Sequence, residues 1–157
     1  GRRGADPYVL AVVVVHHKAS RGFDCQRESE ALQIVDLLSK RMEKEPELNA
    51  VVLGDFNATP FAKSIKVYAD AGFENAYEYR WKTEGNTRDL FRTHESNRAI
   101  DFIMLHPNAW KEAVPGTFQV LGTLNPGKNY NWRTDEPPSG YAADHYPLSI
   151  DLIPKDK

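Results

Sequence analysis

Uninterrupted apolar runs and segments with helical spacing alternate along the chain, which predicts strands and helices in turn. The run Tyr8–Val15 is rich in β-branched residues and predicts a strand that is buried on both faces or central in a sheet. From Gln26 to about Lys44, apolar residues recur at three- and four-residue steps, which predicts an amphipathic helix. A second strand is predicted at Asn49–Leu53 and a second helix at Pro60–Ala71.

Turn-forming residues set the predicted bounds of the second helix and of the later strands. Thr59 and Pro60 suit the N-cap and the first helical position, and Gly72 suits the position just after the last turn. Further strands are predicted at Leu90–Thr93, Ala99–Leu105, Gly116–Leu121 and Leu148–Ile153, and a long loop at Asn125–Gly140.

Aromatic residues gather in Glu74–Asn86, which has no regular period. Tyr77, Tyr79 and Trp81 lie within five residues of one another. We expect them to line a loop against the core, and stacking on nucleic-acid bases is the alternative.

The stretch Leu53–Pro60 places polar groups directly after a predicted buried strand. Gly54 allows the backbone to approach another segment closely. Asp55 and Asn57 are two residues apart, so in an extended chain their side chains lie on the same side. A carboxylate beside a carboxamide, at a strand end that opens onto a helix, is suited to a phosphate or a metal-bound water. The alternative is that these turn-forming residues make only a strand-to-helix loop.

Polar residues also end or interrupt three other predicted strands. His16 and His17 end the first strand as a polar cap or as part of a site, and at least one of them is expected at the surface. Asp101 lies in an apolar strand, where an ionised carboxylate is costly unless it is paired. It either binds nearby backbone or Arg98, or it orients a histidine. Asp144–His145 precedes the last strand.

Length and composition favour a single domain without disulfides. The chain has 157 residues and a formal net charge of −2, so it can bury a core and has no strong basic field to attract nucleic acid, although a local basic rim could suffice. The single cysteine, Cys25, excludes an internal disulfide and a cysteine-based zinc site. No signal peptide and no apolar run long enough to span a membrane is found, and the compartment is not fixed.

The polar residues named above are those of a hydrolytic site that uses a hard cation. Carboxylates and a carboxamide suit Mg²⁺ or Mn²⁺, which prefer oxygen ligands. A histidine can bind a phosphoryl oxygen and stabilise charge in the transition state, and a carboxylate behind it fixes its tautomer. The histidines lack a helical zinc-ligand pattern, and no serine nucleophile elbow, phosphate-binding glycine loop or dinucleotide fingerprint is found.

Three motifs in order give the chain a resemblance to the endonuclease/exonuclease/phosphatase family. They are Gly54–Pro60, Arg98–Ile103 and Ala143–Pro147, and Val15–Lys18 is similar to the family's strand that ends in a histidine. The family includes deoxyribonucleases, AP endonucleases, sphingomyelinases and inositol phosphatases. The resemblance implies an α/β (α+β) fold that is half of a four-layer α/β/β/α sandwich, with a mixed, mostly antiparallel sheet and helices on one face.

The resemblance also implies a role for each matched residue. Asp55 would bind or orient the attacking water near the metal, and Asn57 would position that water or the scissile phosphate. His145 would contact the phosphate and stabilise the transition state, and Asp101 would hold its ring. Asp144 would lie beside the metal or activate water, so Asp55, Asn57 and Asp144 are the expected ligands of Mg²⁺ or Mn²⁺. The reaction would be an in-line attack of a metal-activated water on phosphorus.

The remaining candidates surround that centre. His16 matches the second histidine of the family, whereas His17 stands where the family usually has an apolar residue. Arg98, His94 and Asn57 are the expected substrate-binding residues.

The match covers only the C-terminal half of the family domain, so residues 1–157 are expected to be one domain that is incomplete at its N-terminus. The missing half normally supplies an Asn and the Glu that is the main Mg²⁺ ligand. Glu84, Glu95 and Glu136 are available, but none follows a predicted buried strand. A lone half would expose an apolar face, so we expect pairing with a complementary chain or self-association.

We expect a metal-dependent phosphodiesterase, namely a soluble nuclease acting on DNA or RNA. The His-x-Lys loop, Cys25 and the helix rich in Arg and Glu resemble the secreted bacterial nuclease branch of the family more than the inositol phosphatases. The alternatives are a lipid or sugar phosphoesterase of the same family, an inactive binding or assembly module that lacks the metal-binding Glu, and a structural domain whose polar strand ends only cap the sheet. A basic rim would favour DNA. Its candidates are Arg88, Arg92, Arg98, Lys128 and Arg133.

Overall fold

The framework of the computed structural model is a mixed sheet against which two helices pack. The structure describes residues 8–77, 92–96, 98–121, 131, 134–136, 139–140 and 143–154. The helices are α1 (Asp24–Met42), α2 (Lys63–Asp70) and α4 (Pro107–Trp110), and the strands are β1 (Leu10–His16), β2 (Asn49–Asp55), β3 (Glu74–Asn75), β4 (Asp101–Leu105), β5 (Gln119–Val120) and β6 (Leu148–Ser149).

The main sheet has the strand order β1-β2-β4-β3. β1 runs parallel to β2, whereas β4 is antiparallel to both β2 and β3. β5 and β6 form a separate antiparallel pair. The expected α/β fold with a mixed, mostly antiparallel sheet is therefore confirmed.

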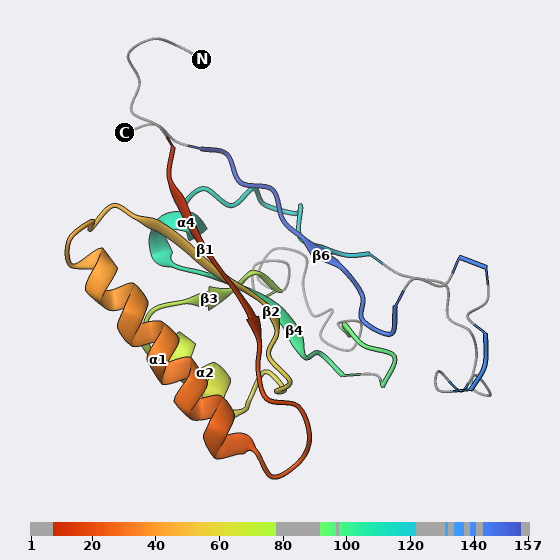
Figure 1. The fold of residues 1–157 in the computed structure, drawn as a ribbon. Helices are drawn as coiled ribbons and strands as arrows, with labels where there is room; N and C mark the ends of the chain where they lie inside the picture. Colours follow the sequence, from red (N-terminus) through yellow and green to blue (C-terminus); the bar gives the residue numbers. More distant parts are fainter. Residues whose placement is uncertain are drawn as a thin grey trace.

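Alternate residues of each strand supply two different apolar clusters, because successive side chains point to opposite faces of a sheet. Val52 and Phe102 face α1 and α2, where Tyr68 and Phe56 are fully buried. Val51 and the neighbouring core residues of β4 face the other way, toward α4 and the β5–β6 pair. Figure 1 shows α1 and α2 together on one side of the sheet and β6 on the other. No helix among the described residues is long and apolar enough to cross a membrane.

The first strand differs from its prediction. β1 lies at the edge of the described sheet, and Val12 and Val14 are 50% and 73% exposed. The prediction of a central or doubly buried strand is therefore wrong for this chain. The reason is that a β-branched run reports a tendency to form a strand but does not say which neighbours the chain itself supplies.

The start of the second helix also differs. α2 begins at Lys63 with Ala62 at the N-cap and no side-chain cap, so Thr59 and Pro60 do not occupy the predicted positions. They form a preceding turn instead, in which the N–H of Ala62 donates to the carbonyl of Thr59 at 2.9 Å. The helix end is as predicted, since Gly72 follows the C-cap with a φ of +88°.

After the second helix, several predicted strands are shorter than expected, and two elements are present that were not predicted. β4 begins at Asp101 rather than Ala99, and β5 and β6 cover only part of their predicted strands. β3 and α4 were not predicted, and Thr93 forms no strand. Tyr77 is buried at 6% exposure and lines the core, as expected. Tyr79, Trp81, residues 90–91 and most of the predicted loop 125–140 lie outside the described residues.

Candidate active site

Three strands bring polar residues to one edge of the sheet. Because β1 is parallel to β2 and β4 is antiparallel to it, the last residues of β1 and β2 meet the first residue of β4. In the register, His16 is the partner of Asp55, and Asp55 is the partner of Asp101. Residues that are far apart in sequence therefore lie side by side at this edge.

Asp55 and Asn57 form a closely bonded pair. The backbone N–H of Asn57 donates to Asp55 Oδ1 at 2.7 Å, and Asn57 Nδ2 donates to Asp55 Oδ2 at 2.9 Å. The expected proximity is present, but the chain is not extended here. Asn57 has a φ of +47°, a left-handed conformation that Asn tolerates better than most residues, so a turn rather than strand alternation brings the two groups together.

The Asn57 carboxamide also reaches β1. Its Nδ2 donates to the carbonyl of His17 at 3.0 Å. Both amide hydrogens are therefore used, and Oδ1 makes no hydrogen bond within the described part of the chain. The oxygen is the atom of this side chain that is left for a metal ion or a substrate.

Asp101 contacts His145, one of the two pairings that the sequence left open. His145 Nδ1 lies 2.9 Å from Asp101 Oδ1 and 3.1 Å from Oδ2, and the Thr93 hydroxyl donates to Oδ2 at 2.6 Å. The other pairing is not formed among the described contacts, because Arg98 donates to Ser96 instead. A proton on Nδ1 leaves Nε2 of His145 directed at the site, 3.9 Å from Asp55 Oδ2.

Burial raises the pKa of Asp101 above its ordinary value. Hydrogen bonds from Thr93 and His145 oppose that rise, whereas the nearby charge of Asp55 adds to it. Thr93, which sequence reasoning did not identify, is fully buried, and its hydroxyl oxygen also accepts the backbone N–H groups of Ile100 and Asp101, both at 3.0 Å. No sequence pattern around Thr93 could have revealed these bonds.

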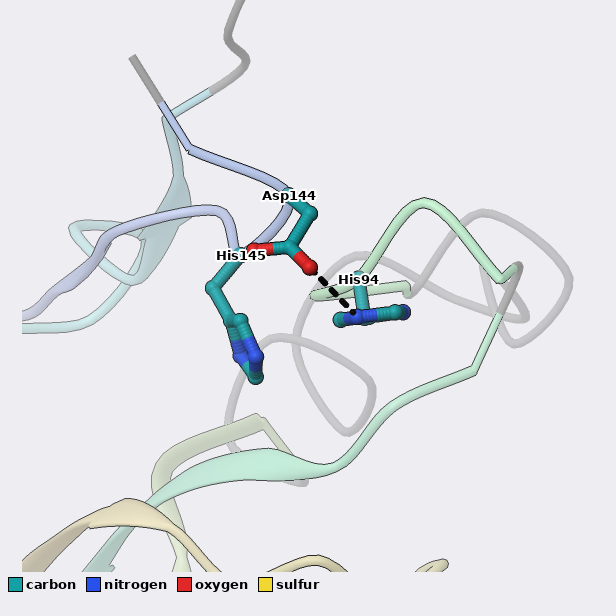
Figure 2. Close-up of side chains that lie close together, drawn as sticks. All are labelled: His94, Asp144 and His145. Atoms are coloured by element: carbon teal, nitrogen blue, oxygen red, sulfur yellow. Dashed lines mark ion pairs between the residues drawn. The ribbon is translucent and has the colours of Figure 1, made fainter. Parts of the chain in front are cut away.

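His94 and Asp144 lie beside His145, and Figure 2 shows the ion pair between them. His94 Nε2 is 3.4 Å from Asp144 Oδ2, and the rings of His94 and His145 meet edge to face at 4.6 Å between centroids. A β-bridge pairs His94 with His145 directly, so backbone contacts hold the two segments together. The N–H of Ser96 donates to His94 Nδ1 at 3.0 Å, which favours the tautomer with its proton on Nε2, facing Asp144.

His16 and Arg98 are the most exposed members of the predicted set. The His16 side chain is 76% exposed, and its Nε2 lies 3.6 Å from Asp55 Oδ2. Arg98 is exposed and follows the segment that carries His94. Its Nε donates to Ser96 Oγ at 2.9 Å, and Ser96 Oγ in turn contacts His94 Nδ1.

Two groups of side chains have the spacing of metal ligands. The first is Asp55, Asp101 and His145, and the second is His94, Asp144 and His145; in each, one ligand atom per residue lies within 4.8 Å of the others. Asp55 and Asn57 supply a carboxylate and a carboxamide oxygen, which are oxygen donors of the kind that a hard divalent cation prefers, whereas Asp101 is bonded to Thr93 and His145. Asp144 belongs to the second group, apart from Asp55.

The sequence offered three glutamates that could replace the family's metal-binding Glu, and they differ in position. Glu84 lies outside the described residues, and Glu136 is exposed. Glu95 is half-buried next to His94, and its Oε1 is buried without a hydrogen bond to the described residues. Its carboxylate does not join either metal-binding group.

Comparison with known proteins gives a family match and several similar folds. The sequence model of the Endonuclease/Exonuclease/phosphatase family matches residues 2–145. The human Nocturnin catalytic domain, solved with a bound sulfate, is 20% identical with a TM-score of 0.54, over 90% of this chain and 46% of that chain. A functionally unknown conserved protein from Enterococcus faecalis V583 is 16% identical with a TM-score of 0.55, over 92% and 50%.

Truncated Caenorhabditis elegans TDP2 is 13% identical with a TM-score of 0.55, over 88% of this chain and 52% of that chain. At these identities the similarity shows the fold alone. The chain spans about half the length of the solved structures that it matches. No curated protein matches it.

Proposed function

The chain belongs to the endonuclease/exonuclease/phosphatase family, which includes metal-dependent phosphoester hydrolases, and we propose that it carries the C-terminal part of the active site of a Mg²⁺-dependent phosphodiesterase. The observation that supports this most is the placement of His145 Nε2 opposite the Asp55 carboxylate, with Asp101 behind the ring. The imidazole Nε2 of His145 and the carboxylate oxygen of Asp55 thus lie side by side at 3.9 Å, so a phosphate bound at this edge of the sheet could contact both groups.

Asp55 and Asn57 would hold the cation. Asp55 supplies a carboxylate, and Asn57 supplies its carboxamide oxygen because both amide hydrogens are already donated. When bound, Mg²⁺ lowers the pKa of a coordinated water and neutralises charge on the phosphate. Manganese would serve with the same oxygen ligands.

His145 and His94 would bind the phosphate. His145, once protonated, would donate from Nε2 to a phosphoryl oxygen, and Asp101 would stabilise the imidazolium through Nδ1. The His94 ring, whose Nε2 faces Asp144 at 3.4 Å, would line the phosphate site beside His145. His16 would contribute a further polar group beside Asp55. Asp144 would act through His94 and nearby water.

A nucleic acid is the substrate that we propose. Arg92 and Arg98 are exposed on the segment that carries His94, where they could contact phosphates that flank the reacting one. The other residues of the predicted basic rim, Arg88, Lys128 and Arg133, lie outside the described residues. A lipid or sugar phosphate would need fewer such contacts, so the length of a preferred substrate separates these classes.

A second polypeptide segment would complete the domain. Val12 and Val14 form an exposed apolar face on β1, and the chain spans about half the length of the similar structures. Both observations support pairing with a complementary chain or with a second copy. Light scattering over a concentration series tests this, because a species that stays monomeric and has no companion would contradict it.

The test of function compares His145→Gln with the unchanged chain. With Mg²⁺, we expect hydrolysis of DNA or RNA that EDTA abolishes, and a loss of about 100-fold or more in the variant. Because His145 is 36% exposed, the variant should fold normally. His106→Gln, at the opposite end of β4, is the matched histidine control and should retain hydrolysis.

The substrates are tested in parallel: duplex DNA, single-stranded RNA, a phospholipid and an inositol phosphate. Hydrolysis of only the last two would replace the nuclease by a lipid or sugar phosphoesterase. A folded chain that hydrolyses none of them, with Mg²⁺ or Mn²⁺, would refute catalysis by this chain and favour a binding or assembly module.

A further inference from the structure

His17 lies on the opposite face of β1 from His16 and is buried between α1 and α2. Its side chain is 3% exposed, its Nδ1 is 2.9 Å from Glu30 Oε2, and its Nε2 is 3.0 Å from the Tyr68 hydroxyl. A buried imidazole is costly unless both nitrogens are hydrogen-bonded. Here both nitrogens have partners, so the ring is held from two helices at once.

The partners fix the direction of each hydrogen bond. Burial raises the pKa of Tyr68, so its hydroxyl keeps its proton and donates to Nε2 of His17. Burial alone would raise the pKa of Glu30, but hydrogen bonds from Lys18, His17 and Gln26 outweigh it and lower that pKa. The ionised carboxylate then accepts the proton of His17 Nδ1.

Glu30 also holds the peptide that joins His17 to Lys18. Its Oε2 accepts the backbone N–H of Lys18 at 3.0 Å, and the carbonyl of the same peptide unit accepts Asn57 Nδ2 at 3.0 Å. In a trans peptide the N–H and the C=O point in opposite directions. A bond from Glu30 to one side of this peptide therefore sets the direction of the carbonyl on the other side.

The same segment is joined to Asp55. The backbone N–H of His17 donates to the carbonyl of Asp55 at 2.9 Å, and Asp55 in turn accepts two hydrogen bonds from Asn57. Asn57 thus has a left-handed backbone and a carboxamide whose orientation depends on a carbonyl of β1. Contacts within the Asp55–Asn57 turn alone do not determine where that carbonyl points.

We propose that Glu30, together with His17 and Tyr68, is a positioning set that orients the Asn57 carboxamide through the His17–Lys18 peptide. Its relevance to hydrolysis rests on the proposed function, because Asn57 is the residue expected to present its oxygen to the metal ion. None of the three residues touches the reacting atoms. They connect α1 and α2 to the active-site edge of the sheet.

The test measures the two amide hydrogens of Asn57 separately by NMR hydrogen exchange in the full chain. In Glu30→Ala, the hydrogen donated to His17 should exchange about 5- to 10-fold faster, and the one donated to Asp55 should change much less. Glu30→Gln retains an acceptor oxygen and should restore the protection. Asp36→Ala is the matched control, since it removes another α1 carboxylate whose ion pair is with Lys40 on the exposed surface.

Activity gives the second readout. Glu30→Ala should lower kcat by about 5- to 10-fold with KM little changed, and Glu30→Gln should recover it. If Glu30→Ala does not fold, Tyr68→Phe replaces it, because that change removes only one hydroxyl group, and the same selective gain in exchange is expected.

The proposal would be overturned if the hydrogen donated to His17 exchanges at the same rate in Glu30→Ala as in Glu30→Gln and Asp36→Ala. This holds even if Glu30→Ala lowers the melting temperature. A chain that hydrolyses no substrate would refute the proposed function and leave the exchange comparison to decide the positioning role by itself.

Discussion

Gly54 provides the most direct test of how closely β1 and β2 approach one another. Its φ is +131°, and a Cβ added to it would lie 2.1 Å from the carbonyl oxygen of Val15 and 3.1 Å from the carbonyl carbon and nitrogen. All three atoms belong to the backbone of the neighbouring strand, so no side-chain rotation relieves the contact. Gly54→Ala is therefore expected to force β1 away from β2.

The cost has two parts. An alanine at this positive φ costs about 1–3 kcal/mol. Restoring a normal contact distance moves the strands apart by roughly 1 Å and disrupts the ladder near Val15, at about 1 kcal/mol for each hydrogen bond lost. With about 2 kcal/mol for the backbone conformation and two hydrogen bonds lost, the sum is about 4 kcal/mol, a large part of the roughly 5–15 kcal/mol that typically stabilises a domain.

Gly22 supplies a matched control. Its φ is +83°, but a Cβ there would meet nothing within 4 Å, so Gly22→Ala carries the conformational cost of about 1–2 kcal/mol and no collision. Urea unfolding followed by circular dichroism measures both variants. If the losses in free energy of unfolding agree within about 1 kcal/mol, the close approach of β1 to β2, and with it the placement of His16 beside Asp55, is wrong.

Four further predictions concern the site and its surroundings. Asp101→Asn should reduce hydrolysis about 100-fold or more by removing the charge behind His145. Because the pKa of Asp101 is raised in the folded state, its ionisation lowers the free energy of unfolding as the pH rises through that pKa. Urea unfolding at a series of pH values should show this fall in the unchanged chain and not in Asp101→Asn. Burial lowers the pKa of His17, so the free energy of unfolding should fall as the pH drops below about 6.5. The double variant that combines His17→Leu with Tyr68→Phe should show a smaller fall. Val12→Thr/Val14→Thr should weaken any association through β1, as sedimentation would show; unchanged association would place the interface elsewhere.

Sequence reasoning succeeded where a residue type has few physical options. Gly54 was expected to permit a close backbone approach, and the neighbouring strand is what approaches. An ionisable residue in an apolar strand needs a partner, and Asp101 has one in His145. Amphipathic spacing likewise predicted α1 to within two residues at each end.

The failures concern information that lies outside the local pattern. The apolar run of β1 predicts a strand, but not the edge position that leaves Val12 and Val14 exposed. Thr59 and Pro60 are suited to a helix start, yet they satisfy their local preferences equally well in a turn. Alternation places His17 on the face opposite His16, but the partners of His17 come from two helices that follow it in the chain.

Thr93 shows why the geometry of the candidate site cannot be derived from the candidate site residues alone. Its hydroxyl donates to Asp101 and accepts the N–H groups that begin β4, and its carbonyl accepts the N–H of Tyr146 at 2.6 Å. One buried residue thus joins the strand that carries Asp101 to the segment that carries His145. Because these bonds position both members of the pair, the separation of Asp101 and His145 is set by the backbone rather than by the attraction of the two side chains. The same holds for Asn57, whose carboxamide is directed by a β1 carbonyl. In both cases a neutral group that is not itself a candidate for the chemistry determines where a candidate site residue lies.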